Sequence, residues 1–295
     1  MELRHLRAFQ AVMHTGSTVE AAKKLGVSQP TISRLIGELE VFTNERFFVR
    51  VNGRLSPRES AELILPDVER TLASVEGFYA RVNQAAVPLR VGAPAGVVTR
   101  LIGPAVRRLL EHNPKQKVVA EIMSYYEIVG AVASGRIDLG FVKAPTEHPA
   151  LELEELVQVG TDVVLRNDHP LCQKQEVSPH DLASENLILL GRNRPFRVQL
   201  DQIFIQHGIS PSILIETQAV SAACSFVREG VGLTIANSLL ARAEAKGELT
   251  CRPFVAPLTP QHQFMLAFLK RPSRARMLRA FSKHLKDVAH EILVA

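Results

Sequence analysis

The pattern of apolar and polar positions divides the chain into a short helical segment, a heptad-like segment, and a longer segment where strands and helices alternate. Between residues 61 and 82, apolar side chains recur at spacings of four and three, which favours a helix that pairs with a second copy of itself. The alternative is a helix lying on its own domain, and Pro66 predicts a start or a kink. The stripe consists of Ala61, Leu65, Val68, Leu72, Val75, Tyr79 and Val82.

After residue 88, short β-branched runs alternate with helical stretches, which is typical of parallel βαβ units. Strands are expected at 89–92, 118–123, 137–142, 187–190, 213–217 and 232–235, with helices between those of each set. Two similar joints, residues 133–140 and 227–234, place Gly135 and Gly230 at helix ends, where a left-handed cap is needed. The pattern predicts an α/β fold with two similar lobes.

The first 58 residues carry the signals of two short helices joined by a tight turn. Ser17 and Glu20 have the spacing of a capping box, and Gly26 allows the turn. Ser28 caps the second helix, and Pro30 falls in its first turn, where a missing N–H costs nothing. The side chains expected to be buried on the second helix are Ile32, Ile36 and Leu39.

The outward face of that second helix carries amide, hydroxyl and guanidinium groups that can read base edges in a major groove. Beyond it, Asn52-Gly53 between β-favouring runs predicts a hairpin wing whose arginines reach phosphates. The alternative is an ordinary pair of helices with a solvated polar face. The predicted DNA-contacting residues are Ser28, Gln29, Pro30, Thr31, Ser33, Arg34, Arg50, Asn52 and Arg54.

Charge sharpens this prediction, because the net charge of +5 is spread unevenly along the chain. Residues 1–58 hold 9 Lys/Arg against 5 Asp/Glu, residues 59–87 hold 2 against 5, and the rest hold 24 against 20. The positive density is therefore highest where the two helices and the wing are expected, which favours a polyanionic partner there.

These residues resemble the winged helix-turn-helix of LysR-type transcriptional regulators, and the resemblance runs the whole length of the chain. Other segments are similar to members that regulate lysine biosynthesis and opine or basic amino acid metabolism. One departure is 56–59, Ser-Pro-Arg-Glu, where the family usually has glycine. The matching residues are Ala21, Ala22, Leu25, Ser28, Gln29, Pro30, Ser33, Arg34, Leu39, Glu40, Phe47, Phe48 and Arg50.

The resemblance implies a winged domain at 1–58, a dimerising linker helix at 59–87 and an effector-binding domain at 88–295 that resembles periplasmic binding proteins. Lobe 1 would cover about 88–161 and 266–295, and lobe 2 about 162–265. It also implies a homodimer or homotetramer on a double-stranded DNA operator, with RNA polymerase as a further partner.

In a two-lobed α/β domain, ligands lie in the crevice beyond the carboxyl ends of the strands, where helix N-termini present free N–H groups. Free N–H groups and two arginines suit a carboxylate, so the expected effector is a small amino-acid-like carboxylate. The alternative is that the two arginines are solvated loop residues. The candidate effector residues are Pro94, Ala95, Gly96, Tyr125, Arg192, Asn193, Arg194, Gln218 and Ser221.

No cofactor, metal or catalytic role is expected. Among ten histidines, His284 and His290 are the pair close together in the last expected helix, and six residues apart they lie on different faces. No nucleophile elbow, phosphate loop or metal triad is visible. The remaining alternatives are a cytosolic solute-binding module and a redox-sensing regulator. Reduced thiols at Cys172, Cys224 and Cys251, no secretory signal and no bilayer-length apolar run favour a cytoplasmic protein.

Overall fold

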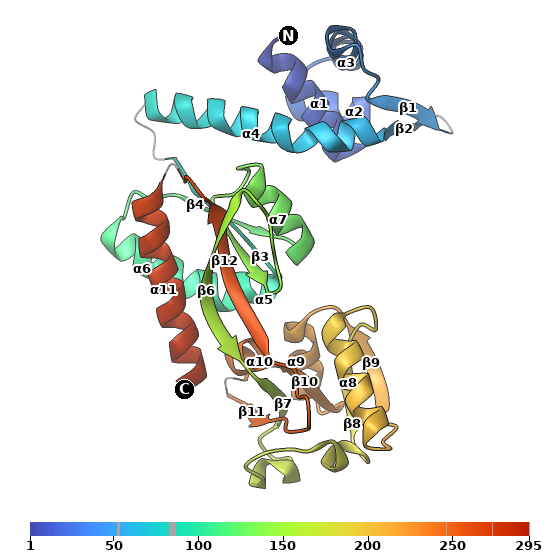
Figure 1. The fold of residues 1–295 in the computed structure, drawn as a ribbon, viewed down its shortest axis with the longest axis vertical. Coiled ribbons are helices and arrows are strands. Elements are labelled where there is room, and N and C mark those ends of the chain that lie inside the picture. Colours follow the sequence, from blue (N-terminus) through green and yellow to red (C-terminus); the bar gives the residue numbers. More distant parts are fainter. Residues whose placement is uncertain (52–53, 83–86, 246, 273, 295) are drawn as a thin grey trace.

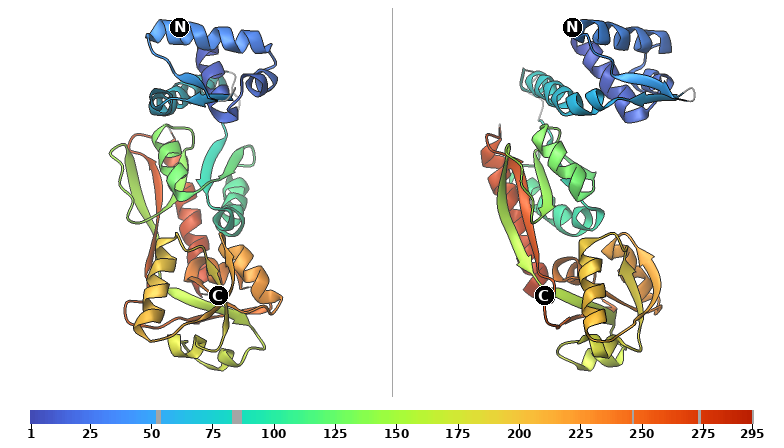
Figure 2. Two further views of the ribbon diagram at one scale, coloured as in Figure 1. Left: turned by 90° about the vertical axis from the view of Figure 1, so that its right-hand side faces the viewer. Right: turned by 45° about the vertical axis from the view of Figure 1, so that its right-hand side comes forward.

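The computed structural model describes residues 1–51, 54–82, 87–245, 247–272 and 274–294. An N-terminal winged unit lies at one end, the long helix α4 (Glu59–Val82) runs beneath it, and two α/β lobes follow in a row (Figure 1). The turned views in Figure 2 show the same order of parts.

The winged unit contains α1 (Leu3–Thr15), α2 (Thr18–Leu25), α3 (Gln29–Thr43), β1 (Phe48–Val51) and β2 (Arg54–Pro57). Gly26 ends α2 with a φ of 66°, and Ser28 accepts the Thr31 N–H at 3.3 Å to cap α3, both as predicted. The two strands pair antiparallel, with Phe48 opposite Pro57. The expected stripe on α3 is buried, because Ile32, Ile36 and Leu39 pack into one core with α1.

The capping box expected at α2 is only half formed. The Ser17 hydroxyl accepts the N–H groups of Val19 and Glu20 at 3.2 and 3.5 Å. The Glu20 carboxylate, however, pairs with the Lys23 ammonium at 2.7 Å instead of returning to the Ser17 N–H. The Ser17 N–H instead donates to the Thr15 hydroxyl at 3.4 Å, and this hydrogen bond replaces the one predicted to the Glu20 carboxylate.

Helix α4 begins at Glu59 and continues through Pro66, so of the start or kink expected at Pro66 the start is wrong. Ala61, Val68 and Leu72 of the predicted stripe are buried against the winged unit of the same chain. Tyr79, further along, is 54% exposed. The first half of the stripe therefore completes the winged core of the same chain, whereas Tyr79 in its second half is exposed.

Lobe 1 is a five-stranded sheet in the order β4-β3-β5-β12-β6. Helix α7 covers one face, while α6 and α11 pack on the other (Figure 1). Gly140 lies under α7, where a Cβ would overlap Ile128 and Val132. The elements are β3 (Leu89–Ala93), α5 (Ala95–Val97), the π-helix η1 (Val98–Ile102), α6 (Gly103–His112), β4 (Val118–Ile122), α7 (Tyr125–Ala133), β5 (Leu139–Lys143), β6 (Leu151–Val159), β12 (His262–Leu269) and α11 (Ala275–Val294).

Lobe 2 is a second five-stranded sheet in the order β11-β7-β10-β8-β9. Helix α8 packs on the face that carries Val163 and Leu189, and α9 and α10 pack on the face that carries Val164 and Ile188. The elements are β7 (Thr161–Arg166), the 3-10 helices η2 (Pro170–Gln173) and η3 (Pro179–Leu182), β8 (Asn186–Leu190), α8 (Pro195–Gln206), β9 (Ser212–Thr217), α9 (Val220–Arg228), β10 (Leu233–Asn237), α10 (Ser238–Glu244) and β11 (Leu249–Pro253).

The chain passes between the lobes twice, from β6 to β7 at Gly160 and from β11 to β12 through residues 254–261. The predicted glycine caps are confirmed, since Gly135 and Gly230 have φ values of 71° and 74°. The prediction of parallel βαβ units is incomplete, because each sheet also contains antiparallel pairs. Strand β12 pairs antiparallel with β5 and β6, and β7 pairs antiparallel with β10 and β11.

Candidate functional site

The outward face of α3 is held in place by a chain of polar contacts. Arg34 donates from Nη1 to the Glu38 carboxylate at 2.8 Å, one helical turn away, and the other Glu38 oxygen lies 3.0 Å from Nε2 of His5. The hydrogen bond from His5, and then the neighbouring Arg34, lower the pKa of Glu38. Gln29 donates to the hydroxyls of Thr18 and Ser33 at 3.2 and 2.8 Å.

The predicted DNA-contacting residues of α3 therefore share one surface. Ser33 and Arg34 are exposed, and the Ser28 and Thr31 hydroxyls lie 2.8 Å apart at the start of the helix. Arg50 and Arg54 fall in the two strands of the wing, which supports their assignment to one hairpin. Asn52 lies outside the described residues.

Glu40, which was matched to the family without being given a role, supports this surface from below. Its carboxylate is 8% exposed and accepts the backbone N–H groups of Phe47 and Phe48 at 2.8 and 3.3 Å. Arg46 donates to the same group at 3.0 Å. This buried acid connects the wing to α3, a role for which the only signals in the sequence were an acid within an apolar stripe and a match to the family at that position.

The predicted effector residues come from both lobes. Tyr125 lies in the first turn of α7 in lobe 1, and the positive charge of Arg194 in lobe 2 opposes the effect of burial on the pKa of its hydroxyl. Burial dominates and raises the pKa of Tyr125 to about 12. Arg194 precedes α8 and donates from Nη2 to the Gln218 carbonyl at 2.8 Å.

The other predicted effector residues differ in how well they are placed. Arg192 donates to Glu216 at 2.7 Å and is 77% exposed, so its charge is already neutralised at the surface. Asn193 is also exposed. Half-buried positions at the lobe-facing ends of β3 and α9 are taken by Pro94, Ala95, Gly96 and Ser221. We call the group Pro94, Tyr125, Lys143, Arg194 and Gln218 the inter-lobe site.

Lys143 and its neighbour His262 were not predicted from the sequence. Lys143 ends β5, and its ammonium lies 2.9 Å from Nδ1 of His262, the first residue of β12. Burial lowers the pKa of Lys143, and burial together with the Lys143 charge lowers the pKa of His262 to about 3. A single lysine at the end of a short apolar run gave no signal of this pairing, which only the sheet register creates.

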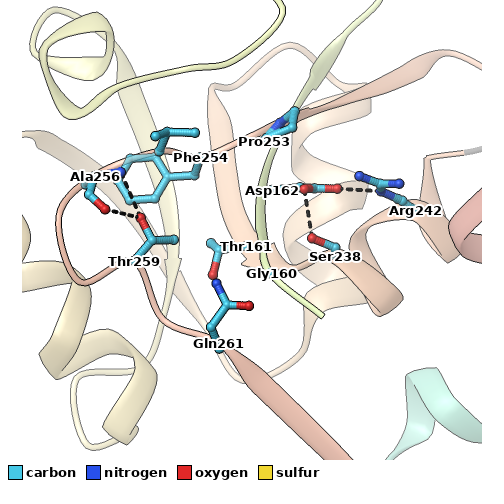
Figure 3. A pocket seen from close by; sticks show the side chains of 11 residues that line it. Gly160, Thr161, Asp162, Ser238, Arg242, Pro253, Phe254, Ala256, Thr259 and Gln261 are labelled. Carbon is cyan, nitrogen blue, oxygen red and sulfur yellow. Dashed lines mark hydrogen bonds and ion pairs between the residues drawn. The ribbon is translucent and has the colours of Figure 1, made fainter. Parts of the chain in front are cut away.

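A pocket of about 380 Å³ lies beside the two passages between the lobes (Figure 3). On its wall the buried Asp162 carboxylate accepts hydrogen bonds from Ser238 and Arg242, both at 2.8 Å. Arg242 also donates to the Leu293 carbonyl at 2.8 Å, so the pocket wall joins α10 to the end of α11. None of the predicted effector residues lines this pocket.

Two of the three thiols do not have the environment of redox sensors. Burial raises the pKa of Cys224 and of Cys251 to about 12, which keeps both protonated and unreactive near neutral pH. Within the described residues no group of three metal-ligating side chains occurs. No described helix is long and apolar enough to cross a membrane.

A winged helix-turn-helix joined through a long helix to a two-lobed α/β unit defines the class of ligand-responsive DNA-binding regulators. Residues 3–62 match the family described as bacterial regulatory helix-turn-helix protein, lysR family, and residues 83–290 match the LysR substrate binding domain. The chain belongs to the LysR family of transcriptional regulators, whose members respond to small-molecule effectors.

Two relatives show how far the similarity extends. The transcriptional activator protein LysR of Escherichia coli is 31% identical over 97% of this chain and 93% of its own length. The octopine catabolism/uptake operon regulatory protein OccR of Rhizobium meliloti is 30% identical over 86% of this chain and 85% of its own. Both are regulators of transcription.

Solved structures support the fold. CbnR, a LysR family transcriptional regulator, superposes with a TM-score of 0.68 at 24% identity over 98% of this chain and 99% of its own. A full-length OxyR variant from Pseudomonas aeruginosa gives a TM-score of 0.71 at 22% identity, covering 98% of this chain and 97% of its own.

Proposed function

We propose that the protein binds an operator in double-stranded DNA through α3 and the wing, and that a small amino-acid-like carboxylate bound between the lobes changes this binding. The observation that carries the DNA proposal is the α3 face itself, where Gln29, Ser33 and Arg34 stand together with no acid before Glu38. Duplex DNA as target also makes the protein cytoplasmic in this proposal.

The roles of the DNA-contacting residues follow from their chemistry. Ser28, Gln29, Pro30, Thr31, Ser33 and Arg34 would enter the major groove, where glutamine matches adenine and arginine matches guanine. Arg50, Asn52 and Arg54 of the wing would contact phosphates, which positions the protein without reading sequence.

A homodimer or homotetramer is the proposed assembly, because the second half of α4 leaves apolar side chains uncovered. Phe78 and Tyr79 are 56% and 54% exposed, and their rings pack edge to face. Pairing there would place two α3 helices on one side of the DNA, at about 34 Å or a multiple of it. RNA polymerase is a further proposed partner of the DNA-bound assembly.

The effector proposal is supported by positive groups near the lobe junction. Lys143 of lobe 1 lies beside His262, and Arg194 of lobe 2 precedes helix α8, whose Phe196 packs on the His262 ring. The relative named for octopine catabolism favours an amino acid derivative as the ligand class. A coupling of about 1 to 3 kcal/mol between lobe closure and the winged units would suffice for regulation. Because both relatives are regulators, we propose a binding role without catalysis.

The DNA proposal can be tested by selecting bound duplexes from a pool of random sequence. The expected result is an enriched, two-fold symmetric motif for the wild type and loss of that enrichment for Arg34→Ala. A pool that stays random after repeated selection with the wild type would contradict the proposal.

The effector proposal can be tested separately by thermal shift of the purified protein against α-amino and α-imino carboxylates. At least one compound should raise the melting temperature in a saturable way, since a ligand that binds only the folded state stabilises it. If none does, the carboxylate is the wrong ligand class and the DNA proposal is unaffected.

The two other candidate functions receive less support. A solute-binding module would not need the α3 surface, and a redox sensor would need thiols that ionise more readily than the buried Cys224 and Cys251.

A further inference from the structure

The inter-lobe site contains a cation that the described part of the chain does not neutralise. Lys143 is half-buried at the carboxyl edge of the lobe 1 sheet, and its ammonium is hydrogen-bonded to the imidazole of His262. Within the described residues no carboxylate lies within 4.0 Å of its ammonium. Buried or half-buried charges are normally paired, because desolvation makes an isolated charge costly. The missing partner is therefore an anion.

The hydrogen bonds fix the protonation state of His262. The Thr161 hydroxyl donates its proton to the Pro260 carbonyl at 2.8 Å, so toward Nε2 of His262, 3.1 Å away, it can only accept. Nε2 consequently carries the proton, and Nδ1 offers its lone pair to the Lys143 ammonium. The imidazole is neutral, and a second proton on Nδ1 would face a positive charge.

His262 also lies where both lobes meet. Its ring is packed edge to face against Phe196 of α8 in lobe 2, with centroids 4.9 Å apart, and stacks on Phe264 of lobe 1. The neighbouring strands contribute Val159 from β6 and Thr161 from β7, which are uncharged. Lys143 from β5 is the charged group that acts on His262.

Helix α8 adds to the positive potential at this point. Pro195 and Phe196 form its first turn, and the residue before it, Arg194, makes no side-chain cap to the free N–H groups. The N-terminus of a 12-residue helix carries a partial positive charge that favours an anion. Phe196, in this first turn, packs on the His262 ring to which Lys143 is hydrogen-bonded, so the helix N-terminus and Lys143 both lie close to His262.

We propose that Lys143 is the anchor for the effector's carboxylate, and that His262 takes up a proton from solvent when this carboxylate binds. The inference rests on the proposed effector site and adds its anchoring residue and its proton linkage. A carboxylate beside Lys143 cancels the charge that opposes protonation of Nδ1. The Lys143 ammonium exchanges its hydrogen bond to Nδ1 for one to the carboxylate, Nδ1 takes the proton from solvent, and the imidazolium becomes a second donor to the same ligand. Because His262 touches Phe196 and Thr161, this change reaches both lobes at their junction.

Formate is a suitable probe, because it is the smallest carboxylate and stays ionised at pH 5, and formamide is its neutral counterpart. Full-length protein labelled with ¹³C at histidine Cε1 is titrated with sodium formate at constant ionic strength, and His262→Gln assigns the resonance. The expected result is a saturable shift of the His262 signal with formate, none with formamide, and formate affinity that rises from pH 7 to pH 5.

Two variants complete the design. Lys143→Met should weaken formate binding at least tenfold and abolish its pH dependence, whereas Lys115→Met, at an exposed lysine, should behave as the wild type. A formate response of His262 that is absent, or that is equal in Lys143→Met and wild type, overturns the inference. A compound that stabilises wild type and Lys143→Met equally in the thermal-shift panel also overturns it, while the proposed effector class stands.

Discussion

The α3 surface and the inter-lobe site differ in how the chain assembles them. Most of the α3 surface comes from seven consecutive residues, 28–34, on the first two turns of one helix. The inter-lobe site draws Pro94, Tyr125 and Lys143 from three strand ends of lobe 1 and Arg194 and Gln218 from lobe 2. The first site depends on helix periodicity, and the second depends on sheet topology.

The two sites also differ in how their charges are balanced. Arg34 is paired with Glu38 on its own helix, so a base in the groove must compete with an internal carboxylate. Lys143 has the neutral His262 as its partner, and an anion there meets no such competition. The arginine proposed to contact DNA thus has a carboxylate partner within the protein, whereas the lysine proposed to bind a small anion has none within the described residues.

The prediction with the largest expected effect tests whether the proposed DNA-contacting surface depends on a contact between α3 and the wing as well as on α3 itself. Glu40→Leu removes a buried carboxylate and leaves the Phe47 and Phe48 N–H groups without an acceptor, which should cost about 3 kcal/mol of local stability. Amide hydrogen exchange of α3 and the wing measures this free energy. DNA affinity should fall for all sequences, because the wing loses its attachment.

Glu40→Gln is the matched variant, because it keeps an oxygen acceptor and should lose less than half as much. Glu45→Leu, at an exposed acid just beyond the end of α3, is the control and should leave exchange unchanged. Equal protection in Glu40→Leu and wild type would show that the wing is held by its apolar contacts alone.

The same contrast explains what could be predicted from the sequence. The caps at Ser28, Gly135 and Gly230 and the strands of the parallel units were predicted because their signals lie within a few residues. Strands β6, β7 and β11 were missed, because these antiparallel strands are not followed by the α-helix that marks a βαβ unit.

The binding residues follow the same rule. The α3 residues were identified from one helical period, whereas Lys143 and His262 are 119 positions apart and meet only because β12 returns beside β5. Similarly, the heptad pattern of α4 predicted one apolar face correctly, but spacing cannot distinguish a partner copy from the chain's own α1 as the surface that covers Ala61 and Leu72. Long-range pairing is the information that a single sequence lacks.

A second prediction separates base contacts from phosphate contacts within the DNA surface. Arg34→Ala should remove about 1 to 3 kcal/mol of discrimination at one base pair and relax sequence preference there. Arg50→Ala should weaken all sequences and lower the slope of log affinity against log salt by about 1. Fluorescence anisotropy with selected and random duplexes over a range of salt separates the two effects. If neither variant changes DNA affinity, the groove assignment fails.

A third prediction concerns pH and the lobe junction. His262 has a pKa of about 3 when folded and an ordinary value near 6.5 when unfolded, so below pH 6.5 the unfolded chain binds the extra proton. The stability of the folded state is therefore unaffected above pH 6.5 and falls as the pH drops toward 3, by up to about 1.4 kcal/mol per pH unit.

Urea unfolding followed by circular dichroism at pH 7.5, 6 and 5 and at one protein concentration measures this slope. His262→Gln should show a shallower decrease, and His290→Gln, at an exposed position of α11, should keep the wild-type slope. Identical pH dependence in His262→Gln and wild type would mean that the imidazole is not held neutral at the lobe junction.

The smallest predicted effect separates two arginines that sequence alone treated alike. Arg194 directly precedes α8 and its charge acts on Tyr125 of the other lobe, so Arg194→Ala should weaken the binding of a stabilising carboxylate about tenfold, the equivalent of one lost charged contact. Arg192 forms an ion pair with Glu216 at the surface, so Arg192→Ala should change the affinity for the carboxylate less than twofold. Calorimetric titration of both variants with the compound that stabilises the wild type decides the matter. Equal losses would place Arg192 in the inter-lobe site and require its ion pair with Glu216 to open when the ligand binds.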